Sequence, residues 1–100
     1  MKQVVNIINQ VFEIEKKLGN QPVPSIQRHI ERIKNELEEM GYTFHNPLHE
    51  KYDATRTDCD ANIAGSGTGK MTIIEVVKPI IHCRGEEGNK IIQKAIVVVE

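Results

Sequence analysis

The segment Ile63–Thr72, IAGSGTGKMT, comes close to the phosphate-binding loop of nucleotide-hydrolysing enzymes. That loop reads glycine, four residues, glycine, lysine, then serine or threonine, and it opens a helix whose first amides hold the phosphates. Gly69 and Lys70 fit, but Ala64 replaces the first glycine and Met71 replaces the magnesium-binding hydroxyl residue. Because the following residues favour a strand, we expect a glycine-rich turn, and a nucleotide site is the minor alternative.

The histidines and cysteines are further candidates for metal binding or nucleophilic chemistry. His45 and His49 could share a metal ion on a helix, but the proline between them disfavours a helix. Cys59 is flanked by two carboxylates, which disfavour a reactive thiolate. His82 and Cys83 are neighbours, and neighbouring side chains on a strand face opposite ways. We therefore expect no catalytic residue, no metal site and no cofactor.

Composition limits the class of protein. The chain has 100 residues, 39% of them hydrophobic, so its core is modest and a second copy would help to bury apolar surface. A net charge of −1 and an aromatic content of 4% disfavour nucleic-acid binding. No apolar stretch approaches the ~20 residues of a membrane span, and no export signal is recognised. We expect a cytoplasmic protein with free thiols and no membrane partner. A disulfide in a secreted protein is the alternative.

The first forty residues have the apolar spacing of two helices. The first is predicted from about Lys2 to Leu18, where Gly19 and Asn20 end it. The second is predicted from about Ser25, as its N-cap, to Met40, with Gly41 as the stop. The connection is short, so the two helices are predicted to form an antiparallel hairpin over residues 1–41.

Apolar residues cover about half the circumference of the first helix, which is more than one neighbouring helix can cover. We therefore expect the hairpin to dimerise into a four-helix bundle. The predicted dimerisation residues are Val4, Ile7, Ile8, Val11, Phe12, Ile14, Leu18, Ile30, Ile33 and Leu37.

After the second helix the sequence favours strands and turns, and residues 42–100 are predicted to form a compact β domain for partner docking. Asp53–Asp58 is predicted as a polar, weakly alternating strand. Met71–His82 is predicted as a strong strand that Pro79 bends or ends at a sheet edge. Gly85–Asn89 is predicted as a turn. Lys90–Val99 is predicted as the last strand, with both faces of its apolar run covered. The fold class is thus α+β: a helical hairpin followed by a small all-β domain.

The sequence GYTFHNPLHE, Gly41–Glu50, resembles the junction between helix and β domain in GrpE, the nucleotide exchange factor of DnaK-type chaperones. Ile73–Pro79, IIEVVKP, is similar to the family's V-x-E-V-L-Q-K-G-Y strand, and Lys90–Val99 to its closing R-x-L-R-P-A-x-V-x-V strand. The order of the elements also agrees, and the resemblance covers most of the chain. The sequence departs from the family in having only the last turns of the long N-terminal helix, Pro79 and Ile80 for Gly-Tyr, and Gln93 for the second arginine.

This resemblance implies a homodimeric co-chaperone without chemistry of its own, acting in protein folding and the stress response. Its β domain would dock on the ATPase domain of a DnaK-type chaperone and release ADP by stabilising the open cleft. The family's contacts correspond to Val77, Lys90 and Val99, for which core packing or a solvated charge is the alternative. Two other functions remain open: a dimeric structural or adaptor protein without exchange activity, and a nucleotide-binding enzyme that uses Lys70.

Overall fold

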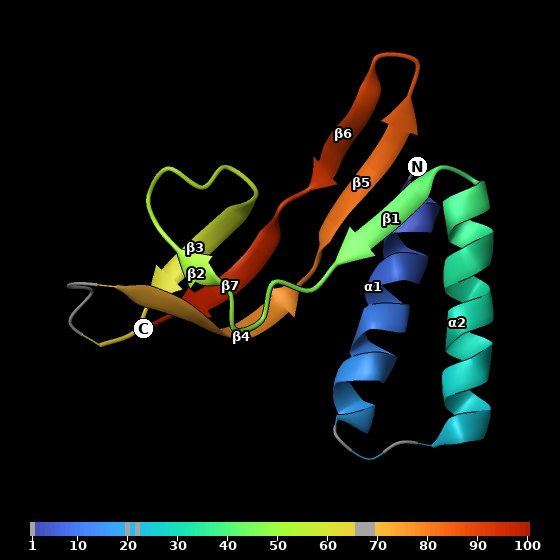
Figure 1. The fold of residues 1–100 in the computed structure, drawn as a ribbon, viewed down its shortest axis with the longest axis horizontal. Helices are drawn as coiled ribbons and strands as arrows, with labels where there is room; N and C mark the ends of the chain where they lie inside the picture. The colour runs from blue at the N-terminus through green and yellow to red at the C-terminus, as the bar shows by residue number, and fades with distance from the viewer. Residues whose placement is uncertain (1, 20, 22, 66–69) are drawn as a thin grey trace.

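The computed structural model describes residues 2–19, 21, 23–65 and 70–100, in which two helices precede seven strands (Figure 1). This part of the chain is α+β, as the sequence predicts. The helices are α1, Lys2–Leu18, and α2, Pro24–Glu39. The strands are β1, Tyr42–His45; β2, Lys51–Tyr52; β3, Cys59–Ile63; β4, Met71–Lys78; β5, Ile80–Gly85; β6, Gly88–Gln93; and β7, Ala95–Val99.

Helix α1 has the predicted bounds, and α2 differs from the prediction at its start. Ser25 is not the N-cap. The cap is Val23, in an extended conformation and without a side-chain cap, and Pro24 follows in the first turn. Proline suits this position because its ring fixes φ and it has no amide hydrogen that needs a partner. At the other end, Gly41 takes a φ of 96° that favours glycine and donates its amide hydrogen to the Glu38 carbonyl at 2.9 Å.

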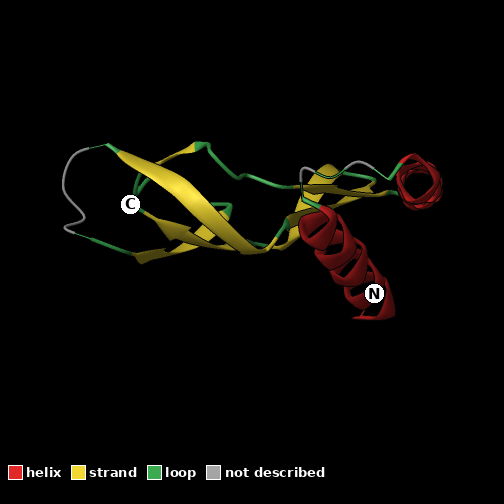
Figure 2. Ribbon diagram, turned by 90° about the horizontal axis from the view of Figure 1, so that it is seen from below, coloured by secondary structure: helices red, strands yellow, loops and turns green. Residues whose placement is uncertain are grey.

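The two helices run in roughly opposite directions but lie at different inclinations. Figure 2 shows α2 end-on, level with the strands, while α1 leaves the plane of the strands obliquely. A salt bridge of 2.8 Å between Lys34 on α2 and Glu15 on α1 joins them. The predicted antiparallel hairpin is therefore present in a loose form.

The strands form two sheets. The first, in the order β1-β5-β6, is antiparallel, and the second has the order β2-β4-β7-β3 with β3 parallel to β7. Strand β4 passes into β5 through Pro79, and β6 passes into β7 through Lys94. Pro79 thus interrupts the first strong run, as predicted. The single last strand predicted over Lys90–Val99 is wrong, because the chain changes sheet at Lys94.

The predicted strand at Asp53–Asp58 is also wrong. The Asp53 carboxylate accepts a hydrogen bond of 2.9 Å from the Thr55 amide, and the Arg56 amide donates to the Asp53 carbonyl at 3.1 Å. This side-chain turn competes with strand pairing. The turn predicted at Gly85–Asn89 is confirmed, because β5 and β6 form a hairpin whose strands pair up to Gly85 and Gly88.

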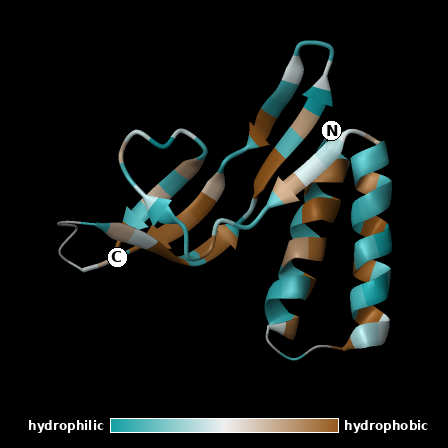
Figure 3. Ribbon diagram, in the orientation of Figure 1, coloured by the Kyte–Doolittle hydropathy of each residue, from teal (hydrophilic) through white to brown (hydrophobic). Residues whose placement is uncertain are grey.

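The core consists of two apolar clusters, one at each sheet. The first joins Phe12 of α1 to β3, β4, β5 and β7, and the second joins Ile8 of α1 to Leu37 and Ile81. Hydrophobic residues gather where β4 passes into β5 and β6 into β7 (Figure 3). Along β7, buried residues alternate with half-buried Ile96 and Val98, so only one face of this strand is fully covered.

Candidate partner-binding surface

The outer face of the second sheet carries an apolar stripe between polar residues. Strand register places Lys78, Ile96 and Asp60 in one row across this face. The next row is Glu75, Val98 and Asn62. The central residue of each row is half-buried, whereas the flanking residues are exposed. An apolar centre with a polar rim is the usual composition of a protein-binding surface.

Two irregularities in β4 expose more apolar surface. The register of β4 against β7 shifts between Ile73 and Glu75, and again between Val76 and Lys78. The residues at these shifts, Ile74 and Val77, are 45% and 42% exposed. A bulge of this kind leaves one residue unpaired and bends the strand, and bulges are common near functional sites.

A small pocket adjoins Ile74. It measures about 130 Å³ and lies between α1, the segment after β1, and β4. Leu48, itself 37% exposed, lines it together with Ile74. The full lining of the pocket is Phe12, Lys16, Asn46, Leu48, Ile74, Glu75 and Val76. Val77 does not line it, but it is exposed three residues after Ile74 on the same strand. We call the three exposed side chains Leu48, Ile74 and Val77 the apolar patch.

The three predicted partner-binding residues do not share one surface. Val77 is exposed on β4 in the second sheet, whereas Lys90 is exposed on β6 in the first sheet. Val99 is completely buried in the core beneath the second sheet, so its side chain is not available to a partner in this conformation. Leu48 and Ile74, the exposed apolar residues at the pocket, are not among the residues that the sequence predicted.

The predicted dimerisation residues divide into two groups. Half-buried or buried within the chain are Val4, Ile8, Val11, Phe12, Leu18, Ile30 and Leu37. Exposed are Ile7 (52%), Ile14 (47%) and Ile33 (41%). The chain's own core therefore uses most of the set, and the three isoleucines remain exposed.

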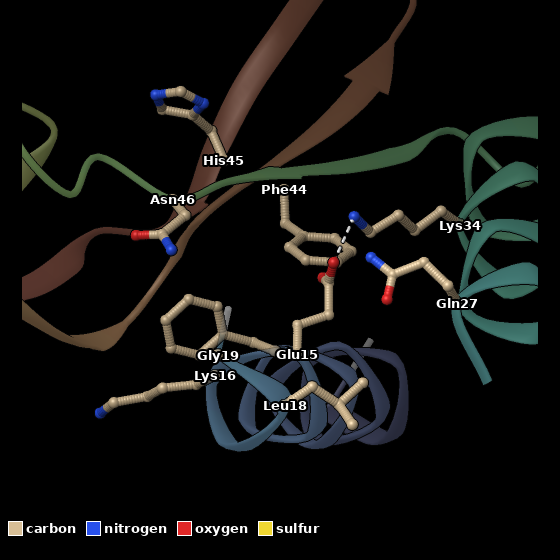
Figure 4. A pocket seen from close by; sticks show the side chains of 10 residues that line it. Glu15, Lys16, Leu18, Gly19, Gln27, Lys34, Phe44, His45 and Asn46 are labelled. Atoms are coloured by element: carbon tan, nitrogen blue, oxygen red, sulfur yellow. Dashed lines mark hydrogen bonds and ion pairs between the residues drawn. The ribbon is translucent and has the colours of Figure 1, made fainter. Parts of the chain in front are cut away.

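A larger and more polar cleft lies between the two helices and the end of β1 (Figure 4). Its volume is about 480 Å³. Lys34 reaches across it to Glu15 at 2.8 Å, and its ammonium nitrogen lies 5.4 Å from the centroid of the Phe44 ring, a cation–π distance. The charges of Lys34 and Glu15 are thus satisfied by each other within the protein.

A cluster of charges around Arg56 holds the loop that follows β2. Arg56 donates to Asp58 at 2.6 Å, to Glu50 at 2.8 Å and to the Lys51 carbonyl at 2.9 Å. The bond from Arg56 lowers the pKa of Asp58. Burial acts to raise the pKa of Glu50, but its hydrogen bonds to Arg56 and His45 prevail and lower it. These bonds hold the loop after β2 to its two ends.

The candidates for chemistry are not assembled into a reactive site. Burial, followed by the neighbouring Asp58, raises the pKa of the Cys59 thiol to about 11, which disfavours a thiolate. His45 contacts Glu50, and His49 occupies a turn with a φ of 71°. In the described ranges, no three histidines, cysteines or carboxylates gather as metal ligands would.

The glycine-rich segment lies partly outside the described residues, since positions 66–69 are not among them. The residues after Lys70 form strand β4, not the helix that a phosphate-binding loop requires. Neither helix in the described ranges is long and apolar enough to cross a membrane.

Comparison with known proteins adds no relative. No family model, curated protein or solved structure matches the chain.

Proposed function

We propose that this chain is a dimeric, GrpE-like co-chaperone that promotes ADP release from a DnaK-type chaperone. The observation that carries the proposal is the apolar patch, because two of its three members lie on β4, the strand that resembles a family strand. The resemblance also includes the junction Gly41–Glu50, which connects α2 to β2 through β1.

The action of such a factor needs binding but no bond-breaking chemistry. A partner docked on the apolar patch would bury Leu48, Ile74 and Val77, with the exposed charges of Glu75 and Lys78 at the rim. If the chaperone's ATPase domain presents the complementary face only in its open form, binding of this protein shifts the population of the ATPase domain toward that form. ADP then leaves, because the open cleft holds it weakly.

Exposed apolar residues on the helices support the dimer. Ile26 and Ile33 on α2 and Met40 at its C-cap follow one another at intervals of seven residues and are 41%, 41% and 61% exposed. On α1, the exposed Ile7 and Ile14 have the same interval. A seven-residue interval keeps side chains on one side of a helix, as in helices that pair with another helix. A second copy of the chain is the partner that we propose for these faces.

The test is release of labelled ADP from a DnaK-type chaperone, with and without this protein. We expect faster release with the wild type and little acceleration with Val77→Glu, because the new charge would be buried on docking. The matched control is Ile63→Glu, at an exposed position on β3, which β7 separates from β4. No acceleration by the wild type would refute exchange activity.

Lys90 needs a separate variant because it lies in the other sheet. Lys90→Glu is expected to weaken chaperone binding and to leave the dimer intact. Unchanged binding would remove Lys90 from the contact surface, while the apolar patch would still be tested by Val77→Glu.

A dimeric adaptor without exchange activity is the second candidate. The burial of Val99 favours it, because one of the three family contacts has no accessible side chain. Binding of the chaperone without faster ADP release would support the adaptor over the exchange factor.

A further inference from the structure

The side-chain amide of Gln93 makes three hydrogen bonds at the junction of the two sheets. Its nitrogen donates to the Asn9 amide oxygen at 2.9 Å and to the Pro79 carbonyl at 3.0 Å. Its oxygen accepts from the Asn9 amide nitrogen at 3.1 Å. A primary amide has two N–H donors, so both donors of Gln93 are used. Two amides that bond each other twice are held in one relative orientation.

These bonds join the places where the chain changes sheet. Gln93 ends β6, immediately before Lys94 leads into the second sheet, and Pro79 is the residue between β4 and β5. The bond from Gln93 to the Pro79 carbonyl therefore ties the two crossings to each other. The pair with Asn9 ties both crossings to α1.

Helix α1 contacts both sheets at this junction through its apolar side chains. Ile8 packs with Ile81 in the core of the first sheet, and Phe12 packs in the core of the second sheet. Asn9 lies between these two contacts in the sequence. Apolar contacts are not directional, whereas hydrogen bonds are, so the contacts of Ile8 and Phe12 leave the inclination of α1 less defined than the amide pair does.

The inclination of α1 also shapes the apolar patch. The pocket beside the patch is lined by Phe12 and Lys16 from α1 and by Ile74 and Glu75 from β4. A rotation of α1 relative to the second sheet would move one wall of this pocket against the other. Asn9 lies about one helical turn before Phe12, so the amide pair holds the part of α1 that lines the pocket.

We propose that Gln93, through its pair with Asn9, is a positioning residue that fixes α1 against both sheets and so sets the shape of the partner-binding pocket. The geometric part of this inference stands on the contacts alone. Its consequence for docking rests on the function proposed above.

The test uses residual dipolar couplings of backbone amides in the full chain. In the wild type, one alignment tensor is expected to fit α1, β4 and β7 together. In Gln93→Leu, which keeps a side chain of similar size but removes the three hydrogen bonds, α1 is expected to need a separate tensor. The Leu48 and Ile74 methyl resonances, which report on the pocket, are also expected to shift.

Two further variants complete the experiment. Asn9→Leu removes the pair from the helix side, and leucine favours helix more than asparagine does, so loss of α1 itself is not expected. It should give the same separate tensor as Gln93→Leu, and it decides the question if Gln93→Leu does not fold. Gln10→Leu is the matched control, since it replaces an exposed amide next along α1 and should keep the single tensor.

A single tensor with unshifted methyls in Gln93→Leu and Asn9→Leu would overturn the positioning role. The ADP-release assay then separates this inference from the proposed function. If the wild type accelerates release and the folded variants accelerate it less, positioning affects docking. If the couplings change but even the wild type leaves ADP release unaltered, the proposed exchange function fails and the positioning of α1 remains.

Discussion

At the scale of single residues, Arg56 has the most concentrated set of charged contacts in the described part of the chain. It reaches Glu50 and Asp58 on either side of its own loop, with its side chain only 19% exposed. Planar guanidinium groups hold carboxylates in fixed directions. Arg56 therefore orders the loop after β2, where the sequence pattern predicts a strand.

Replacing Arg56 should lower stability. Arg56→Leu leaves the partly buried Glu50 and Asp58 without their cation, and we expect the free energy of unfolding to fall by about 1–3 kcal/mol. Urea unfolding followed by circular dichroism measures this. Arg84→Leu, at an exposed arginine, should change it by less than about 0.5 kcal/mol. Equal effects of the two substitutions would contradict the role of Arg56.

The same contacts predict an acid dependence of stability. The folded-state pKa values of Glu50 and Asp58 lie below their ordinary values of 4.5 and 3.8. Groups with lowered pKa values stabilise the fold above those ordinary values, and the contribution is lost as the pH falls through the folded-state values. The midpoint of urea unfolding of the wild type should thus fall when the pH is lowered from 6 to 3. The midpoint of Arg56→Leu should fall by less over the same range. Parallel profiles for the two proteins would refute this assignment.

The two cysteines should differ in reactivity. Cys59 is 6% exposed and its pKa is raised to about 11, so about one thiol in a thousand is ionised at pH 8. Cys83 is only half-buried. Iodoacetamide followed by peptide mass analysis should therefore show alkylation of Cys83 well before Cys59 in the folded protein, and of both in urea. Early alkylation of Cys59 would show that this part of the core opens readily.

At the scale of elements, the sequence predicts the helices better than the strands. The bounds of α1 agree because its apolar spacing is sustained over the whole helix. The division of the last predicted strand at Lys94 cannot be predicted from local pattern, since residues on both sides favour strand. The strand divides because β6 joins the first sheet and β7 joins the second. Contacts with residues distant in the sequence decide which sheet each strand joins.

The candidate site could be predicted only in part for a related reason. The sequence Ile73-Ile74-Glu75-Val76-Val77-Lys78 repeats two apolar residues and one charge, a period of three that fits neither a regular strand nor an α-helix. The structure accommodates each triplet with a register shift, which exposes Ile74 and Val77. This repeat is a signal from which Ile74 could have been found. Leu48 has no comparable signal.

Helix α1 should be the element on which both sheets depend. Phe12→Ala removes a ring that is 3% exposed and lies in the core of the second sheet, and we expect a loss of about 3–5 kcal/mol in the free energy of unfolding. Gln10→Ala, at an exposed position on the same helix that is not among the predicted dimerisation residues, should change it by under about 1 kcal/mol. Urea unfolding measures both. A small effect of Phe12→Ala would mean that the second sheet is stable without α1.

At the scale of the whole molecule, the chain is thin for its length, with extents of 41 × 39 × 18 Å. A flat molecule has much surface for its volume, and small domains already bury a low share of their surface. The two separate core clusters follow from this shape. Association with a second copy is a direct way to bury the apolar residues that the flat shape leaves exposed.

The exposed isoleucines of the helices make the dimer testable at one position. Ile33 lies on α2 midway in sequence between Ile26 and the C-cap residue Met40 and is 41% exposed, so in a helix-mediated dimer it would be near the centre of the contact. Ile33→Lys should convert the dimer to a monomer in sedimentation equilibrium and leave the helical circular dichroism unchanged, because a charge buried without a partner is costly only in the dimer. Ile91→Lys, at an equally exposed position on β6, should leave the mass unchanged. A wild-type mass that stays monomeric at all concentrations would refute the dimer. Dissociation by Ile91→Lys in place of Ile33→Lys would move the contact from the helices to the edge of the first sheet.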